Sequence, residues 1–158
     1  MNEIDMMTLA NLTIEALERT AFVVAEPAEE DFMHELADCE WAAKIEYSGP
    51  LAGQVYLSAS TGFLLELAAS ILGTDTDEVS AETEGQDALR EMSNIVGGSV
   101  VSELGGERCE LSLGLPSVLD LSEMPNFGDN AVRCILDSDG ERLDVIWVPV
   151  AASQSKAA

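Results

Sequence analysis

The stretch DALREMSNIVGGSVVSEL, residues 87–104, has apolar residues at helical spacing. At about 100° per residue, one side of such a helix collects its apolar side chains, namely Ala88, Leu89, Met92, Ile95, Val96 and Val100. This side is predicted to bury against a sheet. We place the helix at about residues 81–104 and expect Gly105 and Gly106 to end it.

The opposite side of the same helix is polar. A wedge of roughly 60° contains Asp87, Glu91, Asn94 and Gly98. A glycine inside a helix costs about 1 kcal/mol relative to alanine, so the adjacent Gly97 and Gly98 need a reason. Close packing against a neighbour would explain Gly97. Clearance for the backbone of another molecule would explain Gly98, one turn beyond Asn94.

The E-x-x-N spacing of Glu91 and Asn94 is not specific by itself. The chain repeats it at Glu123 and Asn126, where Pro125 prevents an exposed helical stripe. On the helix alone, an ordinary solvated face explains Glu91 and Asn94 better than a functional site does.

Working outward, the chain alternates helical and strand patterns. Helices are predicted at residues 5–24 and, between Ser60 or Thr61 and Gly73, at about 61–72. Strands are predicted at 41–49 and 53–60, a hairpin around Gly49 and Pro50, and at 108–116, 130–138 and 141–150. We expect a loop at 117–129, a turn at DSDG (137–140), an acidic loop or short helical turn at 26–40, and a solvated connector or frayed helix start at 74–85.

This order predicts an α+β fold, an antiparallel β-sheet packed by helices. A helix followed by two strands occurs twice, which suggests an internal helix-hairpin duplication. A length of 158 residues with 47% hydrophobic content fits one domain, which we place at residues 1–150, with a disordered tail at 151–158.

The charge excludes some partners. Thirty acidic residues against seven Lys and Arg give a net charge of −23, which repels nucleic acid and anionic membrane. No apolar run reaches the roughly 18 residues that span a bilayer. The start, MNEIDMMTLANL, lacks the features of a signal peptide. We therefore expect a soluble, cytoplasmic protein.

The sequence gives little support for a metal site or for a catalytic nucleophile. Cys39, Cys109 and Cys134 form no CxxC pair, and His34 is the one histidine, so a Cys/His zinc site has too few ligands. We expect buried free thiols and a surface histidine, with no Ser-His-Asp or Cys-His mechanism.

With its surroundings, the polar helix stripe resembles the CheC/CheX/FliY family of chemotaxis phosphatases, and within it the CheX branch. The shared pattern is D-x-x-x-E-x-x-N at Asp87, Glu91 and Asn94, followed by GGSVVSELGGE and by CELSLGLPSV, which contains Pro116. The earlier SGPLAGQVYLSASTGFLLELAASILG is similar to the family's hairpin and following helix, so the likeness spans roughly residues 45–120. The chain departs from CheC-type proteins, which carry E-x-x-N twice, because TLAN puts Thr8 where the first glutamate would stand.

The resemblance implies a phosphatase that hydrolyses the aspartyl phosphate of a CheY-like response regulator receiver domain. Asn94 would position the attacking water, and Glu91 would anchor the helix to the receiver's active-site lysine. Asp87, Gly98 and Pro116 would contribute partner contacts. No cofactor is implied in this chain, since Mg²⁺ would sit in the receiver. A homodimer is also implied.

Two alternatives remain open. One is a non-catalytic CheX-like module that binds a receiver or a scaffold. The other is a carboxylate-based metal or hydrolytic enzyme. It is disfavoured because the acidic stretches lack ligand spacing and DSDG lacks the distal glutamate of an EF-hand.

Overall fold

The structure is a computed structural model that describes residues 3–105 and 110–150. Within these residues the helices are α1 (Met6–Ala21), α2 (Thr61–Leu72) and α3 (Gln86–Gly105). The strands are β1 (Glu26–Pro27), β2 (Cys39–Ser48), β3 (Ala52–Ser60), β4 (Ser112–Leu113), β5 (Ser117–Leu119), β6 (Val132–Ser138) and β7 (Glu141–Val150). Short 3-10 turns lie at Glu30–Glu35, Thr76–Glu78 and Leu121–Glu123, and a π turn at Ala81–Gly85 precedes α3.

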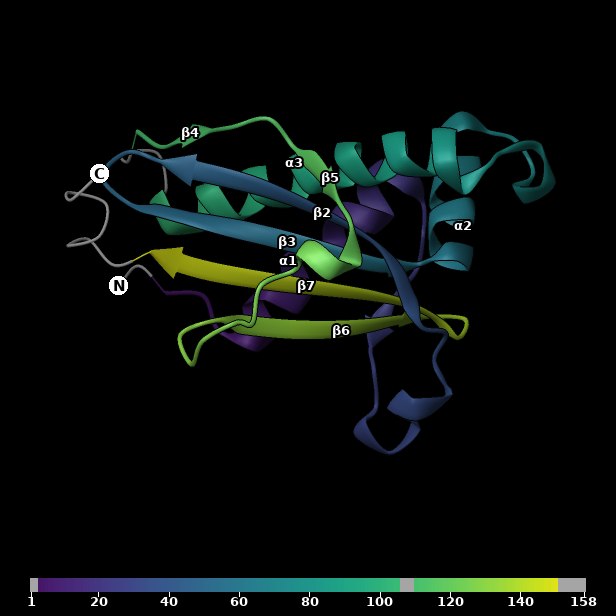
Figure 1. The fold of residues 1–158 in the computed structure, drawn as a ribbon, viewed down its shortest axis with the longest axis horizontal. Helices are drawn as coiled ribbons and strands as arrows, with labels where there is room; N and C mark the ends of the chain where they lie inside the picture. Colours follow the sequence, from purple (N-terminus) through teal and green to yellow (C-terminus); the bar gives the residue numbers. More distant parts are fainter. Residues whose placement is uncertain (1–2, 106–109, 151–158) are drawn as a thin grey trace.

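The strands form one antiparallel sheet in the order β1-β6-β7-β3-β2-β4, with β5 also paired to β2 (Figure 1). Two hairpins, β2–β3 and β6–β7, lie side by side and are joined through β3 and β7, where Val55 pairs with Trp147. The α+β fold with an antiparallel sheet is therefore confirmed. Each half contributes one helix followed by one hairpin, as the sequence pattern suggested.

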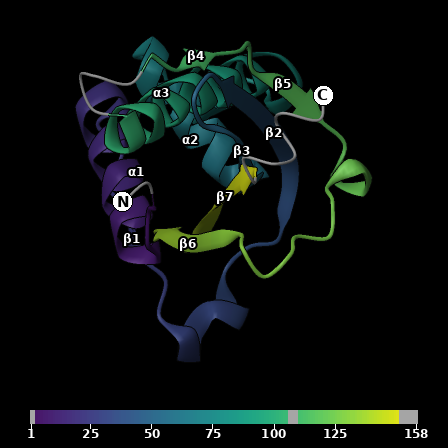
Figure 2. The same cartoon turned by 90° about the vertical axis from the view of Figure 1, so that its left-hand side faces the viewer.

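The helices gather on one face of the sheet, and the connection from β5 to β6 runs over the other (Figure 2). Neither long helix packs on the hairpin that follows it in its own half. Helix α3 packs on β2 and β3, and α1 packs on β6 and β7. Each helix thus covers the hairpin of the other half. The two helices also contact each other, so the core is continuous across both halves.

The predicted apolar side of α3 forms part of this core. Ala88, Leu89, Met92, Val96 and Val100 are buried, and Ile95 is half-buried against the same cluster. Because this apolar side of α3 packs in the core, the opposite, polar side of the helix must face solvent.

Turn chemistry explains where the β6–β7 hairpin reverses. Asp139 and Gly140, between β6 and β7, both have positive φ (51° and 86°), as a two-residue hairpin turn requires. The amide of Gly140 donates to the Asp137 carboxylate at 2.8 Å.

Helix α2 is capped at both ends. The hydroxyl of Ser60 before it accepts from the amide of Phe63, and Gly73 after it has φ 71°. These signals were visible in the sequence.

The strand predicted at 108–116 is wrong in extent, because only Ser112–Leu113 is a strand and residues 106–109 lie outside the described part. The edge of β2 is paired twice, by β4 at Tyr47 and Ser48 and then by β5, with a bend between them. Pro116 stands in this bend and has no amide hydrogen to offer to a ladder. The predicted loop at 117–129 accordingly contains β5 and a 3-10 turn.

Three further boundaries differ from expectation. The acidic stretch contains the expected helical turn and also the short strand β1, which pairs with β6. The helical segment before the stripe begins at residue 81 as expected, but its first turn is a π turn. Helix α3 runs through Gly105. Cys109 and the tail at 151–158 lie outside the described residues, and the domain boundaries stay a prediction.

In the described ranges, no helix is both long enough and apolar enough to cross a membrane.

Candidate functional site

The polar stripe of α3 is exposed as predicted. The structure brings Asp87, Glu91 and Asn94 to the surface on one side of the helix, and Gly98 is half-exposed beyond them. Ser93, between the two motif residues, is buried, and its hydroxyl donates to the carbonyl of Leu89 at 2.8 Å. The stripe is thus presented from a helix whose far side is fixed in the core.

The two adjacent glycines of α3 differ in their surroundings. A Cβ on Gly97 would lie 2.9 Å from Cγ2 of Ile45 in β2 and 3.2 Å from Cδ1 of Leu113 in β4. Gly97 therefore allows α3 to approach the sheet closely. A Cβ on Gly98 would meet nothing within 4 Å, so its missing side chain leaves open space on the exposed side.

The motif side chains differ in their partners. Asp87 forms an exposed ion pair with Arg90 at 2.7 Å. No side chain in residues 3–105 or 110–150 forms a hydrogen bond or ion pair with the side chain of Glu91 or Asn94. One carboxylate and one amide, one turn apart, are thus without a side-chain partner in these residues.

Pro116 comes from a different element. It lies half-buried between β4 and β5, on the segment that borders α3. Its contribution to a partner surface stays a prediction, as does that of Asp87.

The second E-x-x-N sequence is no helical stripe. Glu123 ends a 3-10 turn, and its carboxylate accepts from the amide of Asp120 at 2.9 Å. Met124 is extended. Glu123 therefore caps a turn, as the proline between it and Asn126 implied.

The two cysteines and the histidine that the structure describes form no nucleophilic site. Burial raises the pKa of Cys134 to about 12 and also raises the pKa of the half-buried Cys39. Both thiols are therefore protonated at neutral pH and are poor nucleophiles. His34 is exposed in the 3-10 turn before β2, as expected.

The structure does bring three carboxylates together after α2. Ligand atoms of Asp75, Asp77 and Glu78 lie within 4.8 Å of one another, and all three residues are exposed. The carboxylate of Glu78 accepts from the amide of Asp75 in a capping box, which accounts for the proximity of these two. Sequence spacing alone had not indicated this cluster.

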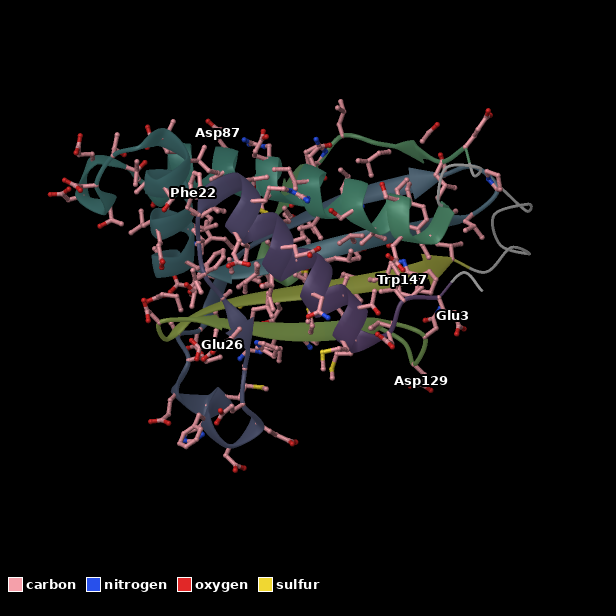
Figure 3. The ribbon with its side chains drawn as sticks, turned by 180° about the vertical axis from the view of Figure 1, so that it is seen from behind. Glu3, Phe22, Glu26, Asp87, Asp129 and Trp147 are labelled. Carbon is pink, nitrogen blue, oxygen red and sulfur yellow. The ribbon has the colours of Figure 1, made fainter. Side chains whose placement is uncertain are left out.

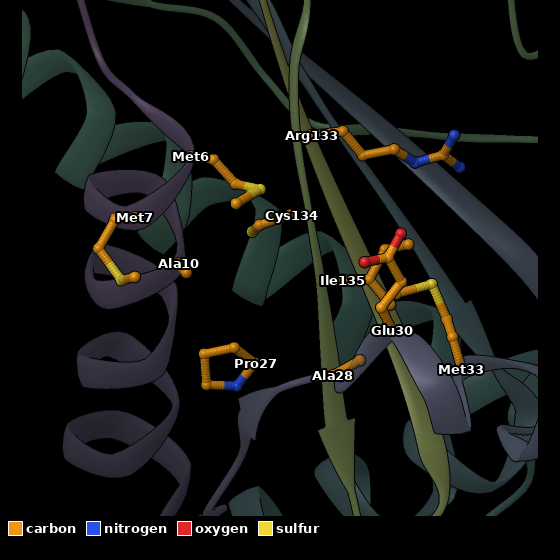
Figure 4. Close-up of a pocket in the computed structure, with 10 residues that line it drawn as sticks. All are labelled: Met6, Met7, Ala10, Pro27, Ala28, Glu30, Met33, Arg133, Cys134 and Ile135. Atoms are coloured by element: carbon orange, nitrogen blue, oxygen red, sulfur yellow. The ribbon is translucent and has the colours of Figure 1, made fainter.

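A hollow of about 470 Å³ lies elsewhere, between α1, the β1 region and β6 (Figure 4). It is lined largely by apolar side chains, including Met6, Met7 and Met33, and Arg133 points away from the others. It contains one carboxylate, Glu30, and no amide side chain. The unpaired carboxylate and amide of α3 therefore lie outside this hollow.

An antiparallel sheet of two hairpins, covered by a helix that presents a carboxylate and an amide one turn apart, is the arrangement expected of the CheC/CheX/FliY class. The family model of the chemotaxis phosphatase CheX matches residues 41–134, a region that contains Glu91 and Asn94. This match covers more than half of the chain, and the chain belongs to the CheX family.

Solved structures share the fold at low sequence identity. The CheX protein of Desulfovibrio desulfuricans has a TM-score of 0.71 and 15% identity, over 90% of this chain and 96% of that one. CheX of Vibrio vulnificus has a TM-score of 0.69 and 15% identity, over 90% and 93%. The CheX–CheY–BeF3–Mg²⁺ complex of Borrelia burgdorferi gives a TM-score of 0.70 and 13% identity, over 94% and 100%. A search of curated proteins found no significant match.

Proposed function

We propose that this chain hydrolyses the aspartyl phosphate of a CheY-like receiver domain. The observation that carries the proposal is the pair of exposed side chains on α3, Glu91 and Asn94, that have no partner among the described residues. Membership of the CheX family and the existence of a CheX–CheY complex in a relative support the choice of substrate.

The chemistry needs no nucleophile from this chain. An acyl phosphate is labile, and hydrolysis requires a water held in line with phosphorus. The water oxygen forms a new bond to phosphorus, the bond to the aspartate oxygen breaks, and a free carboxylate leaves while the water proton passes to the phosphate product or solvent. The amide of Asn94 has an acceptor oxygen and two donor hydrogens and carries no charge that would repel the phosphoryl group. It acts as the glutamine does that orients water in small GTPases.

Glu91 positions the helix in this proposal. Its carboxylate pairs with the receiver's active-site lysine, so that Asn94, one turn further, enters the phosphorylation pocket. A pair of this kind at an interface fixes register and speeds encounter even where its net energy is small. Gly98 gives the receiver backbone room to approach. Asp87 and Pro116 contribute at the rim, and Asp87 exchanges its Arg90 partner for one on the receiver.

Magnesium belongs to the receiver in this scheme, and this chain supplies no metal ligand to the reaction. Two copies of the chain form a dimer in the proposal, as the family resemblance implies. The mass in solution, from light scattering or sedimentation, tests the dimer independently of the chemistry.

The test is the decay of a phosphorylated receiver from the same organism, with wild-type protein or Asn94→Ala added. Because Asn94 holds the water and makes few binding contacts, the variant is expected to lose about a hundredfold or more of the rate. Its affinity for the receiver should stay within a few-fold of wild type. Binding is measured separately by titration.

The outcomes separate the candidates. Faster decay with wild type and not with Asn94→Ala supports both the activity and the residue. Unchanged decay with wild type, despite binding, indicates a non-catalytic module that binds a receiver. Equal acceleration by both proteins contradicts the role of Asn94.

A further inference from the structure

A hollow of about 500 Å³ opens directly beside the stripe of α3. It lies between the end of α2 and the first half of α3, and Thr20 at the end of α1 also lines it. Its apolar wall is formed by Ala68, Ile71, Leu72, Ala88 and Ile95. Its acidic rim is formed by Glu84, Asp87 and Glu91. Glu91 therefore belongs both to the stripe and to the hollow.

The apolar wall is open to solvent. Leu72 is 56% exposed and Ile71 39%, although both are large aliphatic side chains at the end of a helix that otherwise packs well. Phe22, which ends α1 two residues after Thr20, is 85% exposed and has φ 56°. Figure 3 shows it at the same end of the molecule as Asp87. Exposed apolar side chains gathered beside polar ones are typical of a protein–protein contact surface.

The three rim carboxylates are not equivalent. Glu84 accepts from the amide of Ser80 at 2.9 Å and from the hydroxyl of Thr83 at 2.7 Å, and these bonds lower its pKa to about 2. It is thus charged and held in place. Asp87 shares its charge with Arg90. Glu91 is the rim carboxylate left without a partner in the described part of the chain.

We infer that this hollow is a specificity pocket for the receiver, and that it accepts an exposed apolar side chain flanked by a lysine or arginine. The inference rests on the proposed function in one respect, that a receiver is the partner. A surface that brings a lysine to Glu91 must also cover the hollow, because Glu91 forms part of its rim. The apolar wall fits a side chain without charge, and the rim fits a cation next to it.

The charge of the molecule favours this occupant over others. The chain has a net charge of −23, and an acidic rim around the hollow disfavours anionic lipid and acidic segments. A receiver that presents a basic and apolar patch contacts the acidic rim and the apolar wall together, which raises its affinity. Receivers without that patch bind more weakly, so the hollow selects among receivers that share the same phosphorylation site.

The test uses Leu72→Lys, which removes an apolar contact and adds a cation beside the expected cation of the partner. Lysine is favourable at a helix C-terminus, and Leu72 is the last residue of α2, so the fold is retained. Leu72→Gln removes the apolar contact alone. The matched control is Phe32→Lys, since Phe32 is 57% exposed but lies in the 3-10 turn before β2, away from α2. Circular dichroism checks that all three variants fold.

The probe is a receiver from the same organism that carries beryllofluoride and Mg²⁺ in place of the phosphoryl group. The Kd of this receiver is expected to rise about tenfold with Leu72→Lys and about threefold with Leu72→Gln. It should not change with Phe32→Lys. In the decay assay, Leu72→Lys should raise KM with kcat within twofold of wild type, because Leu72 does not reach the reacting atoms.

The results separate the two proposals. A Kd unchanged by Leu72→Lys, with decay still accelerated by wild type, overturns the pocket and leaves the phosphatase intact. A Kd that rises as expected while wild type does not accelerate decay supports the pocket and overturns the phosphatase. A fall in kcat with constant Kd also contradicts the pocket, since docking would then be unaffected.

Discussion

Helices α1 and α3 are built alike but present different surfaces. Each precedes a hairpin and packs on the hairpin of the other half. Each buries one hydroxyl that donates to the carbonyl four residues back, Thr13 to Leu9 at 2.9 Å and Ser93 to Leu89 at 2.8 Å. Their buried sides are thus equivalent in kind.

Their exposed sides are not equivalent. When Asn11 in the TLAN stretch of α1 is aligned with Asn94, three positions correspond to the stripe of α3. Thr8, Asn11 and Glu15 then correspond to Glu91, Asn94 and Gly98. Helix α1 therefore keeps the amide but lacks the carboxylate before it and the open space after it. If the buried hydroxyls are aligned instead, Asn11 and Ile14 stand where α3 has Glu91 and Asn94. Neither alignment gives α1 the pair.

Packing in this fold constrains only the buried sides of α1 and α3. The exposed sides do not pack in the core and can differ between the helices, and the proposed receiver contact accounts for the carboxylate, the amide and the glycine on α3. Helix α1 then serves as an internal control, because the same change made on each helix separates an effect on the fold from one on the site.

The largest effect is expected from charge reversal on the two helices. Glu91→Lys should lower kcat/KM for the phosphorylated receiver about a thousandfold, since a lost pair and a like-charge contact together cost about 4 kcal/mol. The new lysine can pair with Asp87 one turn back, so the helix stays folded. Glu15→Lys, an exposed change on α1, should stay within twofold of wild type. Equal losses in both variants would mean that overall charge, and not the site, sets the rate.

A smaller effect is expected from giving α3 the third residue of the α1 stripe. Gly98→Glu places a long carboxylate one turn beyond Asn94, where it obstructs the receiver and repels the phosphoryl group. We expect kcat/KM to fall about tenfold, with the fold retained because a Cβ at this position meets nothing within 4 Å. Gly98→Ala is the control and should keep most of the activity. Full activity in Gly98→Glu would refute the need for clearance.

The adjacent glycines allow a third comparison, measured as the free energy of unfolding in urea. Gly97→Ala should lose about 1 kcal/mol, because overpacking of about 2 kcal/mol against Ile45 exceeds a gain of about 1 kcal/mol in helix propensity. Gly98→Ala should gain about 1 kcal/mol, because it receives the propensity without the clash. In α1 the position three residues after Asn11 is Ile14, which is half-buried and packs against the core. Equal stability of the two variants would show that Gly97 is not a close contact.

The sequence predicted the features that depend on local pattern. The three helices, both hairpins, the Ser60 and Gly73 caps and the exposed stripe follow from periodicity and turn chemistry within a few residues. The close packing of Gly97 against the sheet followed from its place on the helical wheel, whereas the clearance for a partner at Gly98 stays a prediction.

The features that depend on distant contacts were missed. The short strands β1 and β5 exist because β6 and β2 offer free edges, which the two or three residues of each cannot reveal. The exchange of hairpins between α1 and α3 is a property of the assembled fold. So is the hollow beside Glu91, whose walls come from the ends of three helices. The sequence signal that could have suggested it is the adjacent apolar pair Ile71 and Leu72 directly before the Gly73 cap.

The smallest expected effect concerns the helix starts, which carboxylates stabilise in both halves. Asp5 accepts from the amide of Thr8 at 2.7 Å at the start of α1, and Glu84 accepts from the amide of Ser80 in the turn before α3. These hydrogen bonds lower the pKa of Asp5 and lower that of Glu84 to about 2. Because each folded pKa lies below its unfolded value, the unfolded chain binds more protons in acid, and the stabilisation is lost as the pH falls from about 4.5 towards 2.

Glu84→Gln and Asp5→Asn should therefore flatten the decline in urea midpoint between about pH 5 and pH 2 at constant ionic strength. The flattening should extend to lower pH for Glu84→Gln, whose carboxylate titrates at about pH 2 in the folded state. Glu82→Gln removes an exposed carboxylate from the same turn and controls for net charge. If all three variants flatten the decline equally, general repulsion in a chain of net charge −23 causes it, and the two helix starts contribute nothing specific.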